Sequence, residues 1–143
     1  MATRIQVVFD AADPDKIAHF WAEALGYTIQ PPPEGYESWQ QWLTQMGIPE
    51  SEWDKASAVV DPDGDGPRIF FQKVPEPKAV KNRVHLDVSV AGRDTPPDQR
   101  RPKVDAEVQR LEKIGATQLY VLEQYGGYHV TMADPEGNEF CVH

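Results

Sequence analysis

The chain contains the motif Asp-Pro-acid-Gly twice, at residues 61–64 and 134–137. A helix pattern precedes each copy and ends at a glycine, Gly26 in the first half and Gly115 in the second. Both halves follow one order: strand, helix, two strands, turn, strand. Strands joined by tight turns are not parallel neighbours, because a parallel pair needs a crossover of about a dozen residues or more. The repeat predicts an α+β fold of two βαβββ modules rather than a doubly wound parallel sheet.

The first module, about residues 4–75, begins with a strand pattern and a strong helix start. Asp13 is suited to cap a helix whose first residue is Pro14, and Gly26 follows the apolar stripe of that helix. A polar insert at residues 34–54 interrupts the module and carries three of the four tryptophans. We expect strands at residues 5–10, 27–30, 56–60 and 68–74, and a short helix within the insert at 38–46.

The second module, about residues 82–143, opens on a run of alternating residues at 84–90. Its apolar side chains point to one side of the expected strand, while His85, Asp87 and Ser89 point to the other. We expect a polar loop over 91–101, a helix over 103–114, and strands at 118–122, 128–132 and 139–142. The two modules are expected to share one domain, residues 1–143.

Charge and composition restrict the partners of this chain. Its 143 residues include 14 basic and 23 acidic side chains, which give a net charge of −9. This excludes nucleic acid and membrane surfaces as partners, because both are bound through a basic face. No apolar run approaches the roughly 18 residues of a membrane span. The N-terminus runs directly into a strand pattern and a single cysteine suits a reducing compartment, so we expect a cytoplasmic protein.

Three segments carry a resemblance to a known family. They are Asp13-Pro14 with Phe20-Trp21 and Leu25-Gly26-Tyr27, then residues 81–87 (KNRVHLD), and then residues 134–140 (DPEGNEF). Through them the chain resembles the vicinal oxygen chelate superfamily, which has the glyoxalase and bleomycin-resistance fold, and in particular its bacterial glyoxalase-like proteins. The resemblance spans nearly the whole chain except the insert. It implies paired βαβββ modules whose curved mixed sheet encloses a cavity.

The resemblance also implies a metal site. Enzymes of the superfamily typically hold a divalent metal through side chains from four strands, and the ion acts as Lewis acid and template. Gln6 falls on the first ligand position, His85 on the equivalent position of the second half, and Cys141 on a position where glutamate is usual. Gln72 is the best candidate for the remaining position. The implied metal is Zn, Ni, Fe or Mn, and Glu139 is the candidate base.

This set of ligands departs from the pattern of the superfamily. It contains no carboxylate to neutralise a dication or to move a proton. Two amides, one imidazole and one thiol are poor ligands for Mg or Mn and marginal ones for Zn. Each also has a reading without metal: Cys141 as a buried apolar residue, His85 as a hydrogen-bonded cavity histidine, and Gln6 as a partner of backbone groups.

A pocket with an aromatic wall is the competing prediction. Trp39 and Trp42 are spaced to share one side of the short helix in the insert, where they either face a flat ligand or simply pack the insert against the sheet. The pocket residues that we predict are Val8, Asp10, Trp39, Trp42, Asp87 and Tyr125.

Three functions stay open at this point. The favoured one is binding of a cationic or planar small molecule by a member whose metal site has degenerated. The second is a divalent-metal-dependent lyase, isomerase or dioxygenase that acts on a substrate with vicinal oxygens. The third is an interaction module whose dimer surface is the functional part. We expect a homodimer and a small-molecule ligand.

Overall fold

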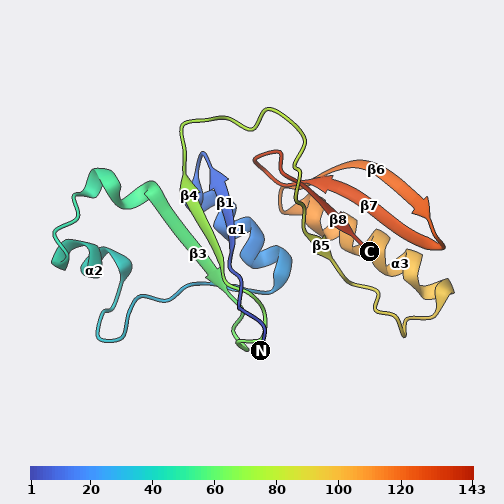
Figure 1. Ribbon diagram of the computed structural model, residues 1–143, viewed down its shortest axis with the longest axis horizontal. Helices are drawn as coiled ribbons and strands as arrows, with labels where there is room; N and C mark the ends of the chain where they lie inside the picture. The colour runs from blue at the N-terminus through green and yellow to red at the C-terminus, as the bar shows by residue number, and fades with distance from the viewer. The chain divides into compact units, whose positions relative to one another are not determined.

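The computed structural model describes residues 1–143, which divide into two compact units, Met1–Pro77 and Lys78–His143 (Figure 1). Each unit contains one four-stranded mixed sheet with an α-helix packed against it. No helix has both the length and the apolar character of a membrane span.

The first unit has the strand order β1-β4-β3-β2. Strands β1 and β4 are parallel, whereas β4, β3 and β2 pair antiparallel. The insert folds into one short α-helix and one 3₁₀-helix. The elements in chain order are β1 (Val7–Ala11), α1 (Pro14–Leu25), β2 (Thr28–Ile29), α2 (Trp39–Gln45), η1 (Glu50–Lys55), β3 (Ala56–Val60) and β4 (Ile69–Lys73).

The second unit repeats this topology with the order β5-β8-β7-β6. Strands β5 and β8 are parallel, and β8, β7 and β6 pair antiparallel. The two βαβββ modules that the repeat predicts are thereby confirmed. The elements are β5 (Asp87–Val88), α3 (Pro97–Lys113), β6 (Thr117–Gln124), β7 (Gly127–Ala133) and β8 (Glu139–Val142).

Helix α1 begins and ends where its sequence signals lie. The side chain of Asp13 accepts a hydrogen bond from the backbone N–H of Lys16 at 3.2 Å. Gly26 adopts the left-handed conformation with φ 70°, which a glycine tolerates without steric cost. Between these ends, the buried Trp21 meets Phe9 edge to face with ring centroids 5.4 Å apart. The helix therefore closes the core of the first unit against one face of its sheet.

The repeated turn motif has a common physical basis in the two units. The buried Asp134 carboxylate accepts hydrogen bonds from the backbone N–H groups of Glu136 and Asn138, both at 2.9 Å. In the first unit Asp61 accepts from the N–H groups of Asp63 and Gly66 at 2.9 and 2.7 Å. The aspartate of each motif thus satisfies backbone donors that the turn leaves without a partner.

Two expected elements differ in length from the structure. The expected strand 84–90 is only Asp87–Val88 in the structure, and Val84 is 82% exposed. The first backbone hydrogen bond to β8 comes at Leu86, whose carbonyl accepts from the N–H of Cys141, so Val84 has no partner strand beside it. Residues 97–101 belong to α3 rather than to a polar loop. Pro97 occupies the first helical position, where its missing N–H costs nothing. Because the helix begins at Pro97, Pro102 lies in its interior.

Candidate functional site

The helix-free face of the second sheet gathers the polar residues of that unit. Side chains alternate along each strand, so Val130, Met132, Phe140 and Val142 are buried toward α3 and their neighbours point the other way. The residues of this opposite face are His85, Asp87 and Ser89 at β5, Glu139, Cys141 and His143 at β8, His129 and Thr131 at β7, and Tyr120, Leu122 and Gln124 at β6.

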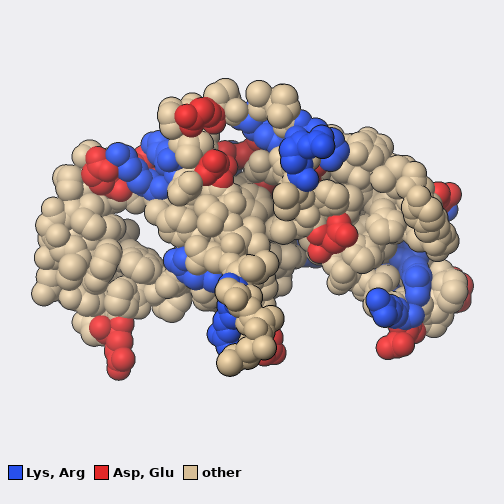
Figure 2. Space-filling model, viewed as in Figure 1, with Lys and Arg blue, Asp and Glu red and all other residues tan.

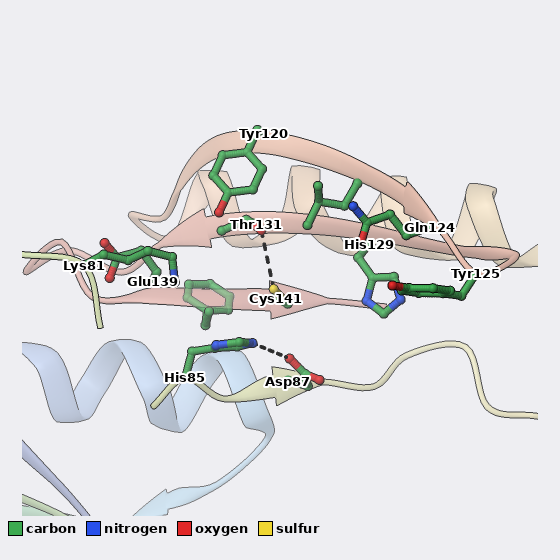
Figure 3. Close-up of a pocket in the computed structure, with 12 residues that line it drawn as sticks. Lys81, His85, Asp87, Tyr120, Gln124, Tyr125, His129, Thr131, Glu139 and Cys141 are labelled. Atoms are coloured by element: carbon green, nitrogen blue, oxygen red, sulfur yellow. Dashed lines mark hydrogen bonds and ion pairs between the residues drawn. The ribbon is translucent and has the colours of Figure 1, made fainter. Parts of the chain in front are cut away.

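This face is hollowed. A pocket of about 390 Å³ lies over it, and Figure 3 shows the side chains of β5, β7 and β8 converging there. Lys81 and Tyr125 extend its rim beyond the strands. Tyr125 has φ 53° at the turn between β6 and β7, and its side chain is fully exposed. The hollow combines imidazole, carboxylate, amide and hydroxyl groups with apolar and aromatic walls.

The lining of this hollow includes a cluster of His85, Asp87 and Cys141. One ligand atom from each of the three lies within 4.8 Å of the others. His85 Nε2 is 3.3 Å from Asp87 Oδ1, and Cys141 Sγ is 3.4 Å from the hydroxyl of Thr131 (Figure 3). Cys141 is buried, whereas His85 and Asp87 are exposed to solvent at the mouth. The structure thus brings together three of the residues singled out from the sequence.

Two histidines that are not among the site residues predicted from the sequence extend this cluster. The rings of His129 and His143 stack with centroids 5.1 Å apart. His143 Nε2 is 2.9 Å from the hydroxyl of Ser89 and 3.9 Å from Asp87 Oδ2. Their signal in the sequence is the strand alternation that places His143 on the face of Cys141 and His129 on the face of Thr131.

Glu139 lines the hollow but its carboxylate is engaged elsewhere. It accepts the backbone N–H of Asn82 at 3.0 Å and lies 3.2 Å from the Lys78 ammonium. The Asn82 hydrogen bond, assisted by Lys78, holds the pKa of Glu139 below its ordinary value. A carboxylate stabilised in this way is a weaker base, because its ionised form is already satisfied.

In the first unit the predicted ligand Gln6 contacts a cation. Its side-chain oxygen, the atom that a metal would bind, accepts a hydrogen bond from Arg68 Nη1 at 2.8 Å. Gln72 donates a hydrogen bond to Asp10 Oδ1 at 2.7 Å. Gln72 and Asp10 are paired residues of β4 and β1, and Asp10 lies four residues beyond Gln6 along the chain. That offset corresponds to about 13 Å of strand length. Gln6 and Gln72 therefore do not meet at one point of this sheet.

Strand register shows which residue occupies the position equivalent to Cys141. Cys141 pairs with Asp87, two residues beyond His85. In the first unit, the residue two positions beyond Gln6 is Val8, and Val8 pairs with Phe70 of β4. Phe70 is therefore the counterpart of Cys141. A phenyl ring offers no ligand atom, and the Arg68 guanidinium repels a dication. The residues present do not fit the four-strand metal site that the resemblance implies.

The remaining predicted pocket residues lie on the first unit. Val8 and Asp10 lie on the helix-free face of its sheet, and Val8 is 47% exposed. Trp39 and Trp42 line a separate hollow of this unit, about 650 Å³ in volume.

The comparisons with known proteins agree with this fold. The sequence profile of a family described as "Glyoxalase-like domain" matches residues 6–143. No curated protein matches the chain. Two solved structures illustrate the likeness.

A glyoxalase/bleomycin resistance protein/dioxygenase family enzyme from Burkholderia phytofirmans is 17% identical with a TM-score of 0.62, over 96% of this chain and 94% of that one. A mutant of the fosfomycin resistance protein FosX from Listeria monocytogenes, in complex with Mn(II) and 1S,2S-dihydroxypropylphosphonic acid, is 12% identical with a TM-score of 0.63, over 100% and 90%. At these identities the structures show the fold alone. From the profile match over nearly its whole length, the chain belongs to the glyoxalase-like domain family of the vicinal oxygen chelate superfamily.

Proposed function

We propose that this chain is a small-molecule-binding member of its family, and that the hollow over the second sheet is the binding site. The observation that carries this proposal is the convergence of His85, Asp87, His129 and Thr131 on one pocket of about 390 Å³. Such a pocket, with apolar walls and a few converging polar groups, has the composition of small-molecule sites.

The chemistry of the pocket favours a ligand that is partly polar. Imidazoles supply a donor and an acceptor, and the Asp87 carboxylate supplies acceptors at the mouth. Tyr120, Leu122 and Phe140 supply the apolar contact area. The ligand class is therefore a small molecule with hydrogen-bonding groups on one side and a flat or apolar part on the other.

Binding without the family's metal is supported by the first sheet. Gln6 is hydrogen-bonded to Arg68, and Phe70 stands at the position equivalent to Cys141. A proposal of metal-dependent lyase or dioxygenase chemistry would need a free Gln6 oxygen and a ligand atom at the position of Phe70. The engaged carboxylate of Glu139 adds to this, since it leaves no free base at the expected place.

The test is a fragment titration followed through the ring Cε1–H signals of the four histidines by NMR. We expect a bound fragment to move the signals of His85 and His129, while that of His19, exposed on α1 of the first unit, stays in place. The Asp87→Asn variant should weaken binding, whereas Asp94→Asn, which changes an exposed acid outside the pocket, should not. A fragment library that leaves all four signals unmoved would refute the proposal.

A second candidate is a transition-metal site confined to the second unit. It is favoured by the cluster of His85, Asp87 and Cys141, whose ligand atoms lie within 4.8 Å of one another. Imidazole, carboxylate and thiolate together suit Zn(II) better than Mg or Mn. Added Zn(II) would then shift the His85 signal at one equivalent, and the Cys141→Ser variant would lose that response.

A further inference from the structure

The first unit contains a second hollow, independent of the site proposed above. Its volume is about 650 Å³, and residues of the insert, of β3 and β4 and of the first turn of α1 line it. Trp39, Trp42 and Trp53 line it from the insert, and Arg68 and Phe70 line it from β4 and the residue before it. All three tryptophans of the insert thus face one space.

The polar edges of two of these indoles are occupied by hydrogen bonds within the chain, which leaves their apolar ring surface for a ligand. Trp39 Nε1 donates to the carbonyl oxygen of Gln30 at 2.7 Å, and Trp53 Nε1 donates to that of Ile48 at 3.0 Å. Trp39 and Trp42 meet edge to face, with centroids 5.6 Å apart and planes at 88°. The perpendicular rings of Trp39 and Trp42, with Trp53 lining the same hollow, resemble in composition the aromatic cages that bind ammonium groups.

These rings are not consumed in packing the insert. Neither α2 nor η1 contains a buried residue, and all three tryptophans are only half-buried. Figure 2 shows a largely uncharged surface over α2, at the left of the molecule. A set of indoles that only held the insert down would have its ring faces covered by other side chains.

The formal charges at the hollow balance once Lys55 and Lys73 are counted, so the preference for a cation rests on the indole rings, with Asp15 as the one local acid that can add to it. Three carboxylates line it, those of Asp15, Glu52 and Asp54, against one guanidinium, that of Arg68. Arg68 is tied to the sheet by hydrogen bonds to Gln30 and Gln6.

The three carboxylates differ in how far they are neutralised. Glu52 and Asp54 pair with Lys55 and Lys73, both at 2.5 Å. The side-chain carboxylate of Asp15 faces only the His19 ring, at 3.5 Å. Asp15 is therefore the lining carboxylate that no lysine or arginine neutralises.

We propose that the tryptophan hollow binds an organic cation, a quaternary or aromatic ammonium group, against the faces of Trp39, Trp42 and Trp53. The negative face of an indole attracts such a group, and its weak hydration lets it leave water for the rings. Asp15 adds long-range attraction. The charged group is held by the first unit alone, so the inference stands or falls separately from the second-unit site.

Three probes of one shape and different charge test this: choline, 3,3-dimethyl-1-butanol and 3,3-dimethylbutanoate. Binding is followed through the indole Nε1–H signals of the four tryptophans by NMR at constant ionic strength. We expect choline to move the signals of Trp39, Trp42 and Trp53, while the fully buried Trp21 serves as an internal reference. Choline should bind at least about threefold more tightly than the neutral alcohol, as a cation–π contribution requires.

Variants separate the rings from the charge. Trp42→Ala, whose indole makes no intramolecular hydrogen bond, should weaken choline binding, and Met46→Ala, an exposed residue of the same insert, should not. Asp15→Asn should weaken choline about twofold and leave the alcohol unaffected. Equal binding of choline and the alcohol, tighter binding of the carboxylate, or no movement of the three signals would each overturn the inference.

Discussion

At the scale of single residues, one aspartate in each unit organises the turn before its last strand. Asp134 is 3% exposed and serves three donors, two backbone N–H groups and the side-chain amide of Asn138. Asp61 serves two backbone donors at a more open site. We therefore expect the aspartate of this motif to contribute more to stability in the second unit than in the first.

We predict that Asp134→Ala lowers the free energy of unfolding by about 3 kcal/mol, because it leaves buried donors without an acceptor. Asp61→Ala should cost clearly less, since water can replace the lost carboxylate there. Urea unfolding of the two variants and of Asp134→Asn, which keeps an acceptor oxygen, measures this. Equal losses for the two alanine variants would contradict the assignment.

Glu139 gives a prediction about pH. Its carboxylate, bound by the Asn82 N–H and Lys78, has a lowered pKa, so it stabilises the fold above its ordinary pKa of 4.5 and loses this effect as pH falls through the folded-state value. Glu139→Gln should cost about 1 kcal/mol at pH 7. The difference from the unchanged protein should vanish in acid.

The measurement is urea unfolding of both proteins at pH values from 7 down to 3. The exposed Glu34→Gln variant is the control and should behave like the unchanged chain. A deficit of Glu139→Gln that stayed constant over this range would show that the carboxylate charge is not involved.

At the residue scale, strand alternation shows which side chains share one face of a sheet, but not what they bind. His85, Asp87 and Cys141 were each singled out from the sequence, and the structure gathers their ligand atoms within 4.8 Å. Alternation alone could not show that Arg68 hydrogen-bonds Gln6 or that Gln72 pairs with Asp10, because these contacts depend on the register of β1 against β4. The register between two strands that are far apart in the sequence cannot be predicted from the residue pattern of either strand.

At the scale of elements, α3 contains a proline in its interior. Pro102 lies inside a helix that runs from Pro97 to Lys113, so it cannot donate to the carbonyl four residues earlier. We predict that Pro102→Ala raises the free energy of unfolding by about 1 kcal/mol, since the restored hydrogen bond outweighs the added chain entropy. Urea unfolding measures the change, with the neighbouring Lys103→Ala as the control. A destabilised Pro102→Ala protein would contradict this account of α3.

The elements show what local signals can and cannot predict. α1 was predictable because Asp13, Pro14 and Gly26 mark both of its ends. The start of α3 lies six residues before the expected residue 103, because no side chain caps this end of the helix and its first turns are polar. The short β5 was overestimated because alternation at 84–90 describes which way side chains point, not where a partner strand is available.

At the scale of the whole molecule, the repeat predicted two modules with the same sequence of elements. The orders β1-β4-β3-β2 and β5-β8-β7-β6 are the same arrangement used twice. The recurring turn motif predicts the antiparallel neighbours of each module, because tight turns join antiparallel strands, whereas the parallel pairs β1–β4 and β5–β8 do not follow from it. The irregular insert at 34–54 has no repeat partner, so its path could not be predicted in the same way.

We also predict that the chain forms a homodimer. Strand β6 is one of the two edge strands of the second sheet, and Leu119, Tyr120 and Val121 on it are 42–45% exposed. Exposed apolar residues on an edge strand favour pairing with a second copy. Sedimentation velocity should give the mass of two chains, and Val121→Lys should give one. A monomer at every concentration would contradict the prediction.

The most direct test of the account is elemental analysis of the protein purified without chelators and without metal-affinity resin. The central claim is the proposed binding of a ligand without the four-strand metal site that the resemblance implies, because Arg68 occupies the Gln6 oxygen and Phe70 offers no ligand atom. We predict far less than one equivalent of any transition metal per chain. One tightly held equivalent of Zn, Ni, Fe or Mn per chain would contradict the claim.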